Sequence, residues 1–207
     1  MKKSDCDFSP LKLNLIQQLE EIVFHMKEGI ETLKADDGCA LSKLEAIKDQ
    51  FETVERMAAS FYLNCYLSPF TDKYLDISTC IQHLSNQRHG ALIVIERKDA
   101  VDPFIHTGTL MQAALTHSLL ESIFYPGNPL HDGAVVIREN QIFSAANTLP
   151  LSAQNWSGKK LGTRHRAAIG LTERCDALVL VVSEETGKVS FAVDGKLHPI
   201  MTTSSPL

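Results

Sequence analysis

The sequence lacks the features of a membrane or exported protein. No apolar run approaches the roughly 20 residues that cross a bilayer. The longest runs, 91–95 and 177–182, have the length of strands. The basic start is interrupted at once by Asp5 and Asp7, which is atypical of an export signal. These absences predict a soluble, cytoplasmic chain with no membrane partner.

Excess positive charge and paired cysteines are also missing. The chain has 20 Lys and Arg against 25 Asp and Glu, for a net charge of -5. Nucleic acid attracts clustered positive charge, so we expect no nucleic-acid partner. The five cysteines include no CxxC pair, which argues against a cysteine-based metal site. Their odd number is typical of free thiols in a reducing compartment.

The common nucleotide-binding and hydrolase motifs are absent. The chain contains no GxxxxGK[ST], no GxGxxG, no HExxH and no GxSxG. A nucleotide site in this protein must therefore use a less common scaffold.

Residues 1–66 predict an N-terminal α-helical hairpin. Ser9-Pro10 is a typical helix start, because serine caps and proline tolerates the first helical position. Apolar residues then recur at steps of three and four over 15–33 and 44–61, with a break at 35–38. A hairpin of two helices cannot bury all of this surface. It packs either on another subunit or on the following domain, and we interpret it as an oligomerisation or regulatory domain.

Residues 67–207 predict a second domain in which helices and strands alternate. The pattern predicts an α/β fold with a mixed, mostly antiparallel sheet flanked by helices. The expected helices are 74–84, 111–124 and 161–174, and the expected strands are 91–95, 134–137, 141–145, 177–182 and 188–193.

Three polar segments next to strands or helices could carry chemistry. In 130–134, Asp132 precedes a strand, and its carboxylate beside His131 could hold a cation or accept a proton. In 162–166, a helix start predicted to be capped by Thr163 carries two arginines, which suits phosphate. In 183–187, two acids follow a strand. Each segment also has an interpretation without function. These are an ordinary turn for 130–134, a solvated helix face for 162–166 and a polar hairpin tip for 183–187.

Taken together, five segments resemble the diadenylate cyclase domain family. They are GALIVIER at 90–97, PLHDGAVVI at 129–137, LPLS at 149–152, GTRHRAAIGLTERCDAL at 162–178 and VVSEETGKVS at 181–190. The resemblance covers about residues 70–200. With its helical hairpin, the chain is similar to the soluble, sporulation-specific branch of that family.

The resemblance implies an enzyme that condenses two ATP molecules into the second messenger cyclic di-AMP. Two domains face each other with one ATP each, so a homo-oligomer with facing sites is expected. Where close relatives carry an aromatic residue before LPLS, this chain has Thr148, so adenine stacking is weaker or comes from elsewhere. The implied catalytic residues are Asp132, Gly133, Arg164 and His165, and the implied ATP contacts are Ala134, Leu149, Thr163, Arg166, Ser183 and Glu184.

A divalent metal is expected with the phosphates, held by His131, Asp132 and Glu185. An imidazole ligand favours Mn²⁺ or Co²⁺ over Mg²⁺. Two alternatives remain open at this point. One is a sensor that binds ATP or cyclic di-AMP without reaction, and the other is a metal-dependent phosphohydrolase.

Overall fold

The computed structural model of the chain describes residues 9–35, 40–106, 108–153 and 161–201. The chain divides into two compact units, Met1–Tyr62 and Leu63–Leu207. The predicted domain boundary after residue 66 stays a prediction.

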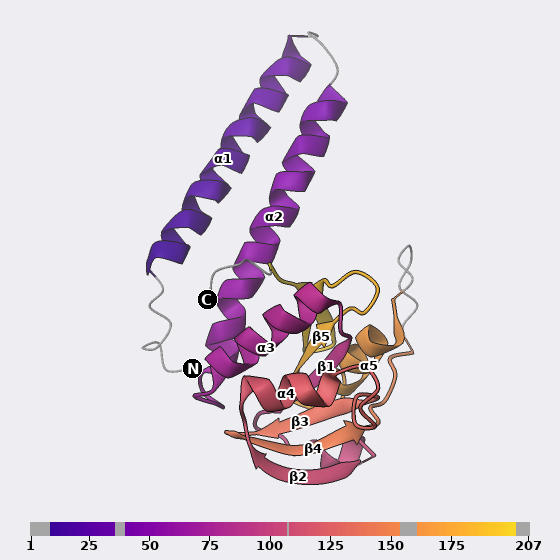
Figure 1. Cartoon of the computed structure of the whole chain (residues 1–207). Helices are drawn as coiled ribbons and strands as arrows, with labels where there is room; N and C mark the ends of the chain where they lie inside the picture. Colours follow the sequence, from indigo (N-terminus) through magenta and orange to yellow (C-terminus); the bar gives the residue numbers. More distant parts are fainter. Residues whose placement is uncertain (1–8, 36–39, 107, 154–160, 202–207) are drawn as a thin grey trace. The chain divides into compact units, whose positions relative to one another are not determined.

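The first unit is a pair of helices. α1 spans Ser9–Lys34 and α2 begins at Ala40 and runs on to Leu67, and Figure 1 shows the two side by side. The helices are joined by polar bonds, among them His25 Nδ1 to Gln50 Oε1 at 3.0 Å. Ile22 and Val54 are buried, but most of the larger apolar side chains of α1 are exposed. The unit therefore keeps an apolar surface that it cannot cover itself.

The second unit is built on a sheet that has seven strands in the described residues, in the order β2-β4-β3-β1-β5-β6-β7. Among these seven described strands, only β1 and β3 pair in parallel, and every other neighbouring pair is antiparallel. The predicted fold class is confirmed. The strands are β1 Ala91–Glu96, β2 Thr109–Ala114, β3 Ala134–Arg138, β4 Gln141–Asn147, β5 Ala177–Val182, β6 Val189–Val193 and β7 Lys196–Pro199.

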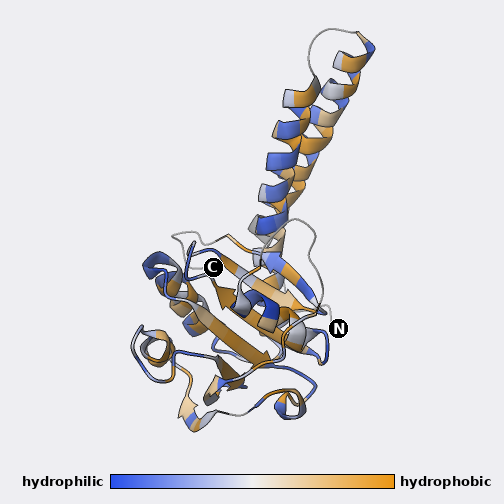
Figure 2. Cartoon of the chain, turned by 90° about the vertical axis from the view of Figure 1, so that its right-hand side faces the viewer, coloured by the Kyte–Doolittle hydropathy of each residue, from blue (hydrophilic) through white to orange (hydrophobic). Residues whose placement is uncertain are grey.

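Helices cover both faces of the central strands. All six residues of β5 are buried, and because side chains alternate between faces, both faces must be covered. α5, Thr163–Thr172, contacts β5, β6, β7 and β1, while α3, Tyr74–Gln87, contacts β5 and packs on α4, His117–Phe124. Figure 2 shows the apolar residues concentrated along these strands.

The two edge strands, β2 and β7, were not predicted from the sequence. The helix predicted over 111–124 is wrong at its start, because Met111–Ala114 belongs to β2, and α4 begins only at His117. There Thr116 caps the helix by accepting a bond from the Leu119 amide at 3.2 Å. β2 pairs with β4 through a register shift, so long-range pairing overrides the helix propensity of its residues. β7, at the other edge, was not predicted.

The expectation of free thiols is only partly right. Cys80 and Cys175 are free and buried, and burial raises the pKa of the Cys175 thiol to about 11. Cys65 is disulfide-bonded.

Candidate active site at one end of the sheet

The sheet topology brings the ends of four strands together. Gly90 precedes β1 and Gly133 precedes β3, and these two strands are parallel. β4 and β5 run the opposite way, so the end of β4 at Asn147 and the residue after β5, Ser183, lie at the same end of the sheet. We call this end of the strands the site edge, which is distinct from the edge strands β2 and β7. Segments far apart in sequence therefore meet where rigid strands end, which is a common position for reactive side chains.

Arg164 and Glu184 form the central contact of this edge. Arg164 Nη1 donates to Glu184 Oε2 at 2.7 Å. Gly90 lies beneath the pair: a Cβ added there would be 2.5 Å from Arg164 Nη1 and 3.1 Å from Glu184 Cβ. The missing side chain at position 90 thus leaves the space that the guanidinium occupies. Gly90 was not singled out from the sequence, although a glycine directly before a buried strand is a signal of close approach.

Two histidines and the two acids of the 183–187 hairpin tip influence one another through their charges. The hydrogen bond from Arg164 and its charge lower the pKa of Glu184, and the charge of His131 adds to this effect. Burial lowers the pKa of His165, and the nearby Glu185 opposes that shift. These charge effects link His131 with Glu184 and His165 with Glu185, across three separate segments.

The Asp132-Gly133 turn is held against β4 by backbone contact. Gly133 has a φ of 109°, and a Cβ there would lie 2.8 Å from the carbonyl oxygen of Asn147. A larger residue would be both strained and crowded at this position. Asp132 itself is exposed, so its carboxylate is open to a ligand.

Asn147 is a fully buried polar residue that fixes this edge. Its Nδ2 donates to the Ala134 carbonyl at 2.7 Å, and its Oδ1 accepts from Ser144 Oγ at 2.9 Å and from the Gly108 amide at 3.0 Å. The side chain ties the starts and ends of three strands together. Sequence reasoning missed this role.

The start of α5 differs in one detail from the expectation. The N-cap is Gly162, without a side-chain cap bond, and Thr163 is the first helical residue. The prediction that Thr163 caps the helix is wrong, because the helix begins one residue earlier than that prediction requires. The first turn carries no acidic residue, so its free amides and the positive end of the helix dipole are uncompensated and suited to an anion.

Of the remaining predicted site residues, some lie at this end of the strands and others lie in the core. Ala134 begins β3 and is fully buried. Leu149 is 6% exposed and packs with Ala167 and Leu171 of α5 in the core. Ser183 Oγ accepts from the Thr186 amide within the hairpin tip. Arg166 donates from Nη2 to the Ser152 carbonyl at 3.2 Å.

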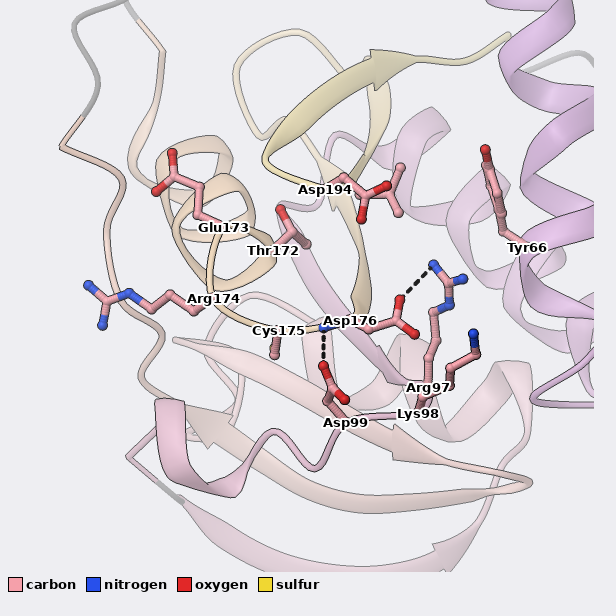
Figure 3. Close-up of a pocket in the computed structure, with 11 residues that line it drawn as sticks. Tyr66, Arg97, Lys98, Asp99, Thr172, Glu173, Arg174, Cys175, Asp176 and Asp194 are labelled. Atoms are coloured by element: carbon pink, nitrogen blue, oxygen red, sulfur yellow. Dashed lines mark hydrogen bonds and ion pairs between the residues drawn. The ribbon is translucent and has the colours of Figure 1, made fainter.

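A cavity of about 570 Å³ lies away from this edge. It is bordered by Arg97 and Asp99, which follow β1, and by Asp176, which precedes β5. Figure 3 shows Arg97 paired with Asp176 and Asp99 bonded to the Asp176 backbone. These positions mark the opposite ends of the same strands. The cavity therefore contains none of the predicted site residues.

Comparison with known proteins identifies the family. The family described as DisA bacterial checkpoint controller nucleotide-binding, abbreviated DAC, matches residues 78–197. The chain belongs to the DAC family. A second family, described as diadenylate cyclase CdaS, N-terminal, matches residues 2–70 ahead of the DAC domain.

Relatives of this chain match it over most of their own length. Diadenylate cyclase CdaS of Bacillus thuringiensis is 50% identical over 92% of this chain and 94% of the relative. Cyclic di-AMP synthase CdaS of Bacillus subtilis is 50% identical over 89% of this chain and 88% of the relative. A crystal structure described as a hypothetical membrane spanning protein from Bacillus cereus has a TM-score of 0.76 and 50% identity, covering 93% of this chain and 95% of that one. Within the described residues, no helix has both the length and the apolar character needed to cross a membrane.

Proposed function

We propose that this chain is a diadenylate cyclase that joins two ATP molecules into cyclic di-AMP and releases two pyrophosphates. The observation that carries the proposal is its place in the DAC family, at 50% identity to relatives named for this activity. The meeting of the Asp132 and Arg164 segments at one sheet edge supports it. ATP as the substrate favours a cytoplasmic enzyme.

Asp132 is the proposed base of the reaction. Its exposed carboxylate accepts the proton of a ribose 3′-hydroxyl, directly or through a metal. The 3′-oxygen then bonds to the α-phosphorus of the ATP on the facing subunit, and pyrophosphate leaves with the electrons of the broken P–O bond. A second, symmetric transfer closes the ring. Such transfers depend on in-line placement and charge neutralisation more than on covalent catalysis.

The start of α5 is the proposed phosphate site. Thr163, Arg164, His165 and Arg166 would face the triphosphate, aided by the uncompensated helix amides. Ser183 and Glu184 border the phosphates from the hairpin tip. Gly133, Ala134 and Leu149 are the proposed contacts of the nucleoside.

We also propose a divalent cation, Mn²⁺, Mg²⁺ or Co²⁺, bound with the substrate. No group of three His, Cys, Asp or Glu side chains within the described residues is arranged to hold an ion. His131, Asp132 and Glu185 can therefore supply only some of the ligands, and phosphate oxygens complete the set, as is usual for Mg²⁺. The ion would supply positive charge to the phosphates. Comparable activity with Mg²⁺ and Mn²⁺ at saturation would contradict the preference that an imidazole ligand implies.

A homo-oligomer with facing sites is part of the proposal, because each domain carries only half of the reacting pair. α1 offers a surface for a second copy of the chain: a groove of about 440 Å³ is lined by Ile16, Leu19, Val23 and Phe24, with Glu20 and Lys27 also lining it. Val23 is 50% and Phe24 59% exposed. Apolar surface of this kind is typical of subunit contacts.

A charge placed in this groove tests its part in assembly. Phe24→Glu should lower the molar mass measured by light scattering and change the turnover per subunit. Glu20→Gln, in the same groove, should leave both unchanged. Unaltered mass and turnover in Phe24→Glu would remove the groove from the assembly.

The decisive experiment is mass spectrometry of the product formed from ATP and Mn²⁺. Wild-type protein should yield cyclic di-AMP, while Asp132→Asn should still bind ATP but form no product. AMP or ADP as the product would indicate a phosphohydrolase, and binding without any product would indicate a nucleotide sensor.

A further inference from the structure

The segment 149–152 lies directly on the backbone of α5. A Cβ added to Gly170 in the middle of the helix would lie 2.3 Å from the Pro150 carbonyl oxygen and 2.5 Å from the Ser152 amide nitrogen. Gly170 has no need of glycine for its own conformation, because it is an ordinary helical residue. The glycine is needed for the close approach of the neighbouring segment.

Ser152 fastens this segment to α5 at both ends of the helix. The Ser152 amide donates to the Arg166 carbonyl at 3.0 Å, and Arg166 Nη2 donates back to the Ser152 carbonyl at 3.2 Å. Ser152 Oγ donates to Glu173 Oε1 at 2.7 Å, and Glu173 is the C-cap residue of α5. We call these three residues the Ser152 clamp.

The clamp is buried at its centre and charged at its ends. Ser152 is 1% exposed, whereas Arg166, in the first turn of α5, and Glu173, its C-cap, are exposed. A hydrogen bond to an ionised carboxylate is stronger than one between neutral groups. The clamp therefore fixes the position of the segment along the helix, because it bonds both the first turn and the C-cap residue.

The two parts that the clamp joins are the two ends of the proposed nucleotide site. Leu149, on the segment, is the proposed contact of the base, and Arg164, in the first turn of α5, is a proposed contact of the phosphates. The distance between base and triphosphate in ATP is limited by the ribose that links them. A ligand that spans both parts binds more tightly only when the separation of the two parts matches the length of the ligand.

We propose that Ser152 and Glu173 are positioning residues, which set the distance between the base-binding segment and the phosphate-binding helix start. This inference rests on the proposed function, because it takes ATP as the ligand that spans both parts. It predicts that Ser152 and Glu173 affect the affinity for a ligand that occupies both parts of the site. Neither residue should affect the affinity for a ligand that occupies only one part.

Three ligands separate this role from a general effect on folding. 3′-Deoxyadenosine triphosphate spans both parts but lacks the attacking hydroxyl, so it binds without reaction. Tripolyphosphate occupies only the phosphate end and adenosine only the base end. In Ser152→Ala and Glu173→Ala, calorimetry should show about tenfold weaker binding of the triphosphate nucleotide, the scale of one lost charge-assisted hydrogen bond. Binding of tripolyphosphate and adenosine should stay within about twofold of wild type, because both parts remain folded.

Two matched variants complete the experiment. Glu173→Gln keeps an oxygen that accepts from Ser152 and should restore most of the nucleotide affinity. Arg174→Ala changes the next, exposed residue and should have no effect. Equal weakening of all three ligands, no weakening at all, or a failure of Glu173→Gln to rescue would each overturn the proposal. If wild-type protein bound no nucleotide, the proposed function itself would fail, which is a separate result.

Discussion

Arg164 is held by Glu184 through a 2.7 Å hydrogen bond that crosses from the start of α5 to the end of β5. The Glu184 side chain is 67% exposed, so solvent screens the pair and its contribution to stability is small, about 0–1 kcal/mol. The pair therefore matters for position more than for folding. It directs the guanidinium over Gly90, at the edge where the phosphates are proposed to bind.

The first prediction follows from the space beneath this pair. Gly90→Ala would place a Cβ 2.5 Å from Arg164 Nη1, and the flexible end of the arginine side chain would move away. Product formation should fall by about tenfold or more, since displacements near 1 Å can cost up to about a hundredfold in rate. The melting temperature should change little, because only the end of a side chain moves. Gly29→Ala, where a Cβ would meet no atom within 4 Å, is the control and should keep full activity.

The second prediction concerns His165 and acid. Burial lowers the pKa of His165 below its usual 6.5, so the folded protein binds fewer protons than the unfolded chain between these two values. This histidine's contribution to stability is full above pH 6.5 and is lost as the pH falls through the lowered pKa. His165→Gln should therefore lose less of its melting temperature than wild type between pH 7.5 and pH 5, as the principle of linkage requires. Equal losses in both proteins would contradict the burial of the imidazole.

The third prediction separates the effect of burial on the pKa of His165 from the effect of the Glu185 charge. The charge of Glu185 raises the pKa of His165 against the effect of burial. Glu185→Gln should lower the pKa further, as measured by an NMR titration of the ring protons. Glu139→Gln, in an exposed turn between β3 and β4, should leave it unchanged. An unchanged pKa of His165 in Glu185→Gln would show that the charge of Glu185 does not act on this imidazole.

The fourth prediction uses the buried amide of Asn147. Asn147→Asp keeps the shape but replaces the donor that bonds the Ala134 carbonyl. Two acceptors would then face each other in the core, and urea unfolding should show a loss of about 1–3 kcal/mol. Asn140→Asp is the matched control, because Asn140 uses its Oδ1 to accept from Thr71 Oγ1 and the Asp72 amide. Aspartate keeps both bonds there, so equal destabilisation in the two variants would count against this account.

Much of the fold could be predicted from local patterns. The two helices of the first unit follow from apolar spacing, and β1 and β5 from continuous apolar runs. The strands expected at 134–137 and 141–145 match the starts of β3 and β4. The two edge strands could not be found in this way, because their exposed, irregular residues are held in place by pairing with distant partners.

The site shows the same division. The sequence by itself determined which segments could carry chemistry, since motif resemblance depends only on residue order, and it identified the DAC family. Only the tertiary structure decided that Gly90 lies under Arg164, that Asn147 ties three strands together and that Ser152 fastens 149–152 to α5. These contacts join residues between 13 and 74 positions apart in sequence. They arise from strand register and helix packing, which no local pattern of residues encodes.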